Sequence, residues 1–155
     1  MAESAGGTST CLVVRVQNCV CALPLTQVIE TMRPLPIEPI AGVPSFVRGV
    51  SIIRGIVTPV VDLGSVLVAR QCSGEHVVTV RLGERQVALA VDAVLGVREL
   101  DSSTVRETPR LLEGASKDVI DGIGTLDEQL LVLLCAGWEL PDEVWQMLTA
   151  LEVTS

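Results

Sequence analysis

The sequence has few aromatic side chains and an uneven charge distribution. Among its 155 residues, the three aromatic ones are Phe46, Trp138 and Trp145. Residues 1–70 carry a net charge of +1 and residues 71–155 a net charge of -9, which gives -8 in total. Nucleic-acid-binding proteins neutralise phosphates with a basic face and often stack bases on aromatic rings. The composition therefore argues against nucleic acid as a partner, and equally against an anionic membrane surface.

Groups that commonly carry catalysis or bind metals are also scarce. His76 is the single histidine, and the five cysteines include no C-x-x-C pair. A zinc site needs four ligands in paired spacing, and a serine or cysteine nucleophile usually needs a histidine base. No glycine-rich phosphate loop and no H-E-x-x-H motif occurs. We therefore predict no enzymatic activity, no metal and no cofactor, and interpret the cysteines as small apolar fillers in a reducing compartment.

Long hydrophobic runs are absent too. The longest apolar run, 130–138, is nine residues long and contains Gly137, whereas a membrane-spanning helix needs about 20 residues. Residues 1–10 contain an acid, no basic residue and no apolar core, so they do not resemble a secretory signal. We expect residues 1–10 to be disordered and the protein to be cytoplasmic, without insertion into a membrane.

What the sequence does contain is a series of short apolar runs rich in β-branched residues, including 25 valines. Glycine, proline or aspartate interrupts these runs about every ten residues, which is typical of an all-β barrel or sandwich. Asp62 is a suitable N-cap for a short helix that ends near Val68. The predicted strands are 11–17, 19–23, 28–33, 50–53, 56–61, 77–82, 86–91, 94–100, 119–126 and 129–135.

The C-terminal segment changes to a helical period. Pro141 suits the first helical position, and the acids that follow it favour the positive end of the helix dipole. We expect this helix to pack on its own domain, since most amphipathic helices do. Its apolar residues at i, i+3, i+4 and i+7 are Val144, Met147, Leu148 and Leu151.

A weak internal repeat relates the two halves of the chain. Segment 21–29 matches 87–95 at an offset of 66, and Gly49 matches Gly122 at an offset of 73. The repeat predicts two five-stranded units of about 65 residues, each too small to bury much surface alone. We expect one unit from each half, with a boundary near 64–76 and a groove between the packed units.

Residues 43–63, VPSFVRGVSIIRGIVTPVVDL, resemble the signature of the CheW family, the coupling proteins of bacterial chemosensory arrays. Segments 22–30, 87–94 and 122–124 resemble further family segments in the same order, so the resemblance spans about 11–137. The matching signature positions are Pro44, Phe46, Arg48, Gly49, Arg54, Gly55, Pro59, Asp62 and Leu63.

The resemblance implies two packed SH3-like five-stranded β-barrels over 11–137, followed by a C-terminal α-helix within 138–155. It also implies a non-catalytic adaptor that couples the cytoplasmic tip of chemoreceptors to the regulatory domain of a CheA-type histidine kinase. The receptor tip is expected in the groove between the barrels. The family's protein-binding positions fall on Val28, Glu30, Gly49, Arg54, Val94 and Gly122.

Each position also has a purely structural interpretation. The two valines would line an apolar groove that accepts a helix, or they belong to the core. The two glycines would allow close backbone approach, or they only form turns. Arg54 would offer a planar charge to a receptor acid or to Glu30, or it is simply solvated beside a hairpin.

The chain departs from the family pattern near these positions. Ile52-Ile53 stands where the family usually has Asn-Leu, and the segment after Leu63 is short, with Gly64 in place of a basic residue. These departures leave open that the chain is a divergent paralogue that binds receptors but not the kinase. A separate alternative is a β-barrel that serves only as a structural oligomerisation unit.

Overall fold

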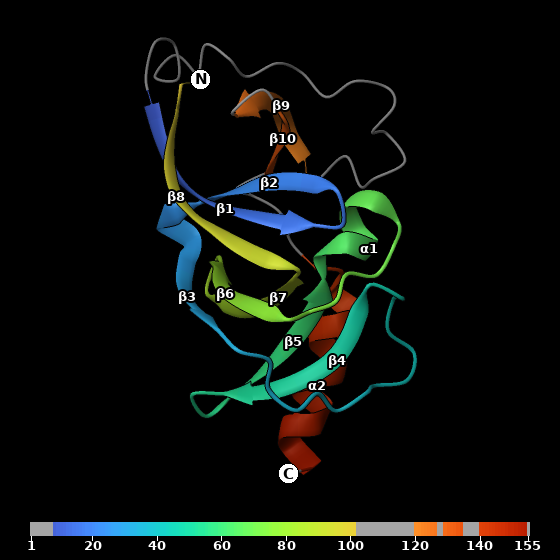
Figure 1. The fold of residues 1–155 in the computed structure, drawn as a ribbon. Helices are drawn as coiled ribbons and strands as arrows, with labels where there is room; N and C mark the ends of the chain where they lie inside the picture. Colours follow the sequence, from blue (N-terminus) through green and yellow to red (C-terminus); the bar gives the residue numbers. More distant parts are fainter. Residues whose placement is uncertain (1–7, 102–119, 127–128, 135–139, 155) are drawn as a thin grey trace.

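The computed structural model describes residues 8–101, 120–126, 129–134 and 140–154. These residues form two five-stranded sheets, one above the other in Figure 1. The first sheet has the order β8-β1-β2-β10-β9, and its strands are Ala93–Asp101, Thr8–Val16, Cys19–Pro24, Gln129–Leu134 and Ile120–Leu126. The second sheet has the order β3-β6-β7-β5-β4, and its strands are Val28–Met32, His76–Leu82, Arg85–Val91, Ile56–Asp62 and Val47–Ile53.

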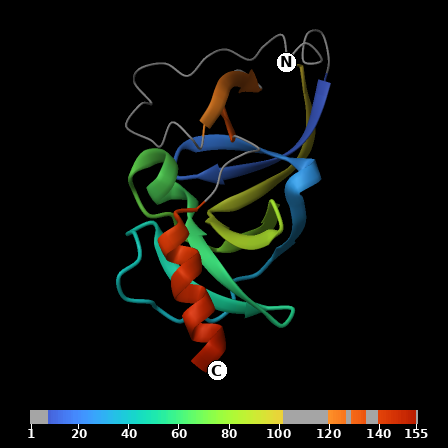
Figure 2. The same cartoon turned by 180° about the vertical axis from the view of Figure 1, so that it is seen from behind.

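The described residues also include three helical segments: the 3-10 turn η2 (Leu25–Gln27), α1 (Leu63–Val68) and α2 (Asp142–Thr154). The predicted N-cap of α1 is confirmed, because the Ser65 amide donates to Asp62 Oδ1 at 2.9 Å. Pro141 lies one residue before α2, and its carbonyl accepts a bond from the Val144 amide at 3.0 Å. Figure 2 shows α2 lying across the second sheet, over β5.

The predicted all-β fold is confirmed, but the division of the sheets between the two halves of the chain is wrong. β1 and β2 join β8, β9 and β10, whereas β6 and β7 join β3, β4 and β5. Each half therefore gives two strands to one sheet and three to the other. The exchange is made by the pairs β1–β8, β2–β10, β3–β6 and β5–β7, each of which joins a strand of one half to a strand of the other. No local pattern encodes pairing at such separation.

The internal repeat itself reappears in the sheet topology. Strands β1 to β5 correspond in order to β6 to β10, and the two sheets have equivalent strand orders. The β-bulges correspond as well. The ladder skips Ile29 in β3 and Leu95 in β8, which are 66 residues apart. It likewise skips Arg48 in β4 and Asp121 in β9, which are 73 residues apart. The predicted offsets are thus those that relate the bulges.

The two sheets share one hydrophobic core. Val14 of β1, Val78 of β6 and Leu89 of β7 are almost fully buried in the same cluster. Leu140, Val144 and Leu148 join it from the C-terminal segment, as expected for a helix that packs on its own domain. A smaller cluster of six residues lies within the first sheet and contains Cys11, Val13, Val20, Ala22, Leu100 and Leu131.

Two further expectations concern the N-terminus and the cysteines. Thr8–Thr10 belong to β1 and pair with β8, so the predicted disorder of 1–10 is wrong at these three residues; residues 1–7 lie outside the described residues. Cys11, Cys21 and Cys72 are buried thiols, consistent with apolar fillers, and Cys19 is half-buried. Burial raises the pKa of all four thiols.

Candidate protein-binding surface

The β4–β5 hairpin ends in a two-residue turn made by Arg54 and Gly55. Both residues have positive φ, +52° and +78°, and Ile53 pairs with Ile56 across the turn. Two successive positive φ values are typical of type I′ hairpin turns, whose twist matches that of the strands they join. The turn places Arg54 at the tip of the hairpin, where 73% of its side chain is exposed.

Arg54 forms a two-pronged ion pair with Glu30 of β3. Arg54 Nε lies 2.7 Å from Glu30 Oε2, and Nη2 lies 2.8 Å from Oε1. The hydrogen bond from Arg54 lowers the pKa of Glu30, and the hydrogen bond to Glu30 raises the pKa of Arg54. This planar geometry is the one that guanidinium and carboxylate groups favour. Of the two arrangements expected for Arg54, the contact with Glu30 is the one present in the isolated chain.

Exposed apolar residues flank the Arg54-Gly55 turn along the chain. Ile52 is 70% exposed and Ile56 is 48% exposed, which makes Ile52 the most exposed of the large apolar residues among those described. A strand residue whose side chain points away from the core is more often polar, because an apolar side chain there would stay in contact with water. The hairpin tip therefore combines a fixed charged pair with uncovered apolar surface, a composition common at protein interfaces.

Val28 and Val94 occupy equivalent positions at the two bulges. Each is half-buried and packs against the main core. The bulged neighbours Ile29 and Leu95 are 40% and 54% exposed, so they present more apolar surface than the valines. A bulge redirects side chains locally, and sequence periodicity alone did not identify these two exposed residues. The 66-residue offset of the internal repeat is the sequence signal that relates Ile29 to Leu95.

Gly49 is a structural residue inside the fold. Its φ is +146°, and a Cβ atom there would overlap the backbone oxygen of Glu38. That approach allows Glu38 to exchange two backbone hydrogen bonds with Val50, at 2.8 and 2.9 Å. Gly122 takes the equivalent place in β9, opposite Leu133 and next to a bulge. Close backbone approach, one of the two roles expected for these glycines, is observed at Gly49.

A second arginine–carboxylate pair lies within the same hairpin. Arg48 Nε and Nη2 lie 2.8 and 2.6 Å from Asp62 Oδ2, and Arg48 Nη2 donates to the Cys72 carbonyl at 2.5 Å. Asp62 is fully buried, and its Oδ1 accepts bonds from the amides of Ser65 and Cys72 at 2.9 and 3.2 Å. These two signature residues thus join β4, β5, α1 and the following loop.

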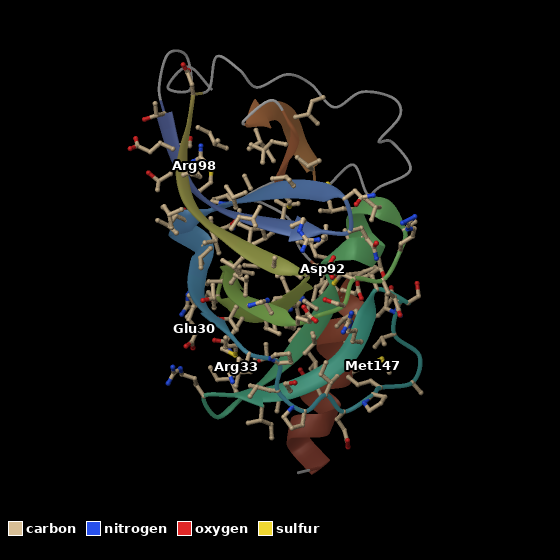
Figure 3. All side chains as sticks on the ribbon, viewed as in Figure 1. Glu30, Arg33, Asp92, Arg98 and Met147 are labelled. Atoms are coloured by element: carbon tan, nitrogen blue, oxygen red, sulfur yellow. The ribbon has the colours of Figure 1, made fainter. Side chains whose placement is uncertain are left out.

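Asp92 likewise joins separate segments of the chain through hydrogen bonds to its carboxylate. Its carboxylate accepts hydrogen bonds from the amides of Gln17 and Ser73, at 2.5 and 2.6 Å. In Figure 3, Asp92 lies in the middle of the molecule, far from Glu30 at the edge of the second sheet. Partial burial acts to raise the pKa of Asp92, but the bonds from Gln17 and Ser73 outweigh it and leave that pKa lowered.

Among the six predicted binding positions, the ion pair of Glu30 and Arg54 is the side-chain contact that the structure describes. Glu30 and Arg54 are in contact, the two valines lie at the bulges of different sheets, and Gly49 is buried against Glu38. Within the described part of the chain, no three His, Cys, Asp or Glu side chains are placed to hold a metal ion. No described helix has the length and apolarity needed to span a membrane.

Comparison with known proteins agrees with this geometry. The family model described as "CheW-like domain" matches residues 10–136. The chain is 30% identical over 98 residues to the chemotaxis protein CheW of Klebsiella aerogenes, covering 61% of this chain and 59% of that protein. It is 27% identical over 111 residues to the chemotaxis protein CheW of Rhizobium meliloti, covering 70% and 72%. The match thus spans less than two thirds of the Klebsiella protein's length.

The fold is also similar to that of a solved structure. The crystal structure of the scaffolding protein TtCheW from Thermoanaerobacter tengcongensis superposes with a TM-score of 0.72 at 21% identity. The superposition covers 83% of this chain and 90% of the other. At this level of identity the likeness establishes the fold: two packed five-stranded units.

Proposed function

Because the chain belongs to the CheW-like domain family, we propose that it is a non-catalytic adaptor in a bacterial chemosensory pathway. It couples the cytoplasmic tip of chemoreceptors to the regulatory domain of a CheA-type histidine kinase, and it acts in the cytoplasm. The family match over residues 10–136 is the observation that carries this proposal.

The hairpin tip is the proposed contact for one partner. Arg54 is held by Glu30 through two bonds, so it loses little further side-chain freedom when a partner binds. Its remaining N–H groups can pair with an acid of the partner. The apolar surface of Ile52 supplies the hydrophobic contact beside that charge.

The predicted groove between the two five-stranded units is the proposed contact for the receptor helix. We propose Val28 and Val94, which are half-buried against the core, as contact residues of this groove, in line with helix-in-groove binding. Gly49 and Gly122 support the strand geometry on either side rather than touching the partner. The six predicted positions thus divide into contact residues and supporting residues.

Calorimetric titration of the purified chain with the regulatory domain of a CheA-type kinase from the same organism tests the proposal. Saturable one-to-one binding at physiological salt is the expected result. Absence of heat with both proteins folded would contradict kinase coupling. A parallel titration with a receptor hairpin-tip fragment separates the two partner interfaces.

A receptor-only adaptor is the second candidate, and the exposure of Ile52 favours it. An isoleucine that is 70% exposed at the hairpin tip changes the surface where the family usually has a polar side chain. This candidate predicts binding of the receptor fragment without binding of the kinase domain. If Ile52→Asn restored kinase binding to a chain that lacked it, the altered surface would be located at that residue.

A structural oligomerisation unit is the third candidate. It predicts that the chain self-associates as its concentration rises. Sedimentation velocity over a roughly hundredfold concentration range measures this directly, and an unchanged sedimentation coefficient would remove the candidate.

A further inference from the structure

A surface groove lies on the second sheet, and neither Glu30 nor Arg54 lines it. It has a volume of about 260 Å³ and is bounded by the β6–β7 hairpin, the start of β5 and α2. Ile56, Trp145 and Leu148 supply its apolar lining, and Arg81 and Arg85 stand at its rim. Figure 2 shows α2 running along this side of the molecule.

Arg85 is held in place by Trp145. The guanidinium carbon lies 4.6 Å from the centroid of the indole ring, in a cation–π contact. Such a contact uses the face of the guanidinium group and leaves the N–H groups at its edges available. A stacked arginine of this kind is preorganised to bind a planar carboxylate through two parallel hydrogen bonds.

The charge of the groove is opposite to that of the protein as a whole. The chain carries -8, and residues 71–155 alone carry -9. The groove nevertheless contains two arginines and one acid, Glu84. Among the described residues, no salt bridge joins Arg81 or Arg85 to a carboxylate; the arginines of the two pairs described above are Arg48 and Arg54. The lining of the groove thus has one more positive than negative charge, and Asp142 borders Arg85 in the adjoining pocket.

The apolar part of the groove is also uncovered. Ile56 is 48% exposed although it borders the indole of Trp145 across the groove. Gln86, at the inner side, is fixed by a 2.9 Å bond from its amide nitrogen to Thr58 Oγ1. The exposed residues at the rim leave the groove open along its length, which suits an extended chain better than a small molecule that must be enclosed.

We propose that this groove binds an extended acidic segment of a partner protein. A carboxylate of the segment pairs with the stacked Arg85, and an adjacent apolar side chain covers Ile56 and Leu148. The site uses neither Glu30 nor Arg54, so it is independent of the coupling contacts proposed above.

The test uses the full chain labelled with ¹⁵N and two blocked pentapeptides, GELEG and its neutral analogue GQLQG. We expect GELEG to shift the Trp145 indole N–H signal and the amides of Arg81 and Arg85 in a saturable manner. The neutral peptide should bind about tenfold more weakly, because it lacks charge-assisted hydrogen bonds. Sodium acetate at equal carboxylate concentration serves as a third ligand.

Variants identify the residues responsible. Arg85→Glu should abolish the GELEG response, Trp145→Phe should weaken it, and the matched charge reversal Arg70→Glu, at an exposed loop position, should leave it unchanged. A dispersed amide spectrum verifies that each variant is folded. Equal responses to both peptides, shifts located elsewhere, no response, or an equal response to acetate would each overturn the proposal.

Discussion

The β4–β5 hairpin carries two arginine–carboxylate pairs with opposite surroundings. At one end, Arg48 binds Asp62, whose side chain is completely buried and which also accepts two backbone amides. At the tip, Arg54 binds Glu30 while 73% of the arginine side chain stays in water. The bond lengths are nearly the same, 2.6 to 2.8 Å. The burial, the number of additional partners and the acceptor arrangement differ, since Arg48 donates twice to one oxygen of Asp62 and Arg54 donates to both oxygens of Glu30.

This difference in burial separates a pair that holds the fold together from a pair that is exposed to a binding partner. A buried carboxylate that loses its cation is left uncompensated, so the inner pair is essential once the fold contains it. An exposed pair contributes little to stability, because water and salt screen it. The outer pair therefore needs another explanation for its two-pronged geometry, and presentation of Arg54 to a partner provides one. Both arginines belong to the same sequence signature, which does not distinguish their roles.

The largest expected effect tests the inner pair. Arg48→Met removes both bonds to Asp62 and leaves its buried carboxylate with two backbone donors. We expect a loss of about 3 kcal/mol in the free energy of unfolding, measured by urea denaturation. A loss no larger than that of Arg54→Met would contradict the distinction between the buried and the exposed pair.

Gly49→Ala comes next. The new Cβ would collide with the Glu38 carbonyl oxygen at a φ of +146°. We expect a loss of about 2 kcal/mol in unfolding free energy, again from urea denaturation. If Gly49→Ala left stability unchanged and weakened partner binding instead, Gly49 would belong to the recognition surface.

Asp92→Asn should have a smaller and pH-dependent effect. The variant loses one acceptor for the Gln17 or Ser73 amide, which costs about 1 kcal/mol near neutral pH. Because the folded-state pKa of Asp92 is lowered, its contribution is present above the ordinary aspartate pKa and is lost as pH falls through the folded value. The gap in unfolding free energy between parent and variant should therefore close below about pH 4. A constant gap from neutral pH down to about pH 3 would contradict this assignment.

The smallest effect on stability is expected at the tip. Arg54→Met, matched to Arg48→Met in chemistry, should leave the urea midpoint within experimental error of the parent, because the pair it breaks is solvated. A clear decrease in the midpoint would show that the Glu30–Arg54 pair supports the fold.

Local features of the fold were predictable from the sequence. Alternating β-branched runs located the strands, Asp62 marked the start of α1, and the offsets of 66 and 73 related the two halves. The exchange of strands between the sheets was not predictable in this way. It depends on the pairs β1–β8, β2–β10, β3–β6 and β5–β7, whose partners come from different halves of the chain, and hydrophobic periodicity is the same for either pairing.

The candidate site was predictable in part. The resemblance selected Glu30 and Arg54, and the structure brings them together. It also selected Gly49, whose role is explained by the approach of Glu38, a contact between a loop and a strand that spacing does not reveal. Ile29 and Leu95 were missed because a bulge interrupts the alternation that separates buried from exposed positions.

The most direct test of the division between architecture and recognition is a charge swap at the tip. Arg54→Glu and the double variant Glu30→Arg/Arg54→Glu are titrated by calorimetry against the kinase regulatory domain, beside the parent and Arg70→Glu. The double variant can rebuild the internal pair but presents the opposite charge. We predict that both variants fold, that Arg70→Glu binds like the parent, and that the double variant does not regain binding. Full binding by the double variant would show that the pair acts only within the fold.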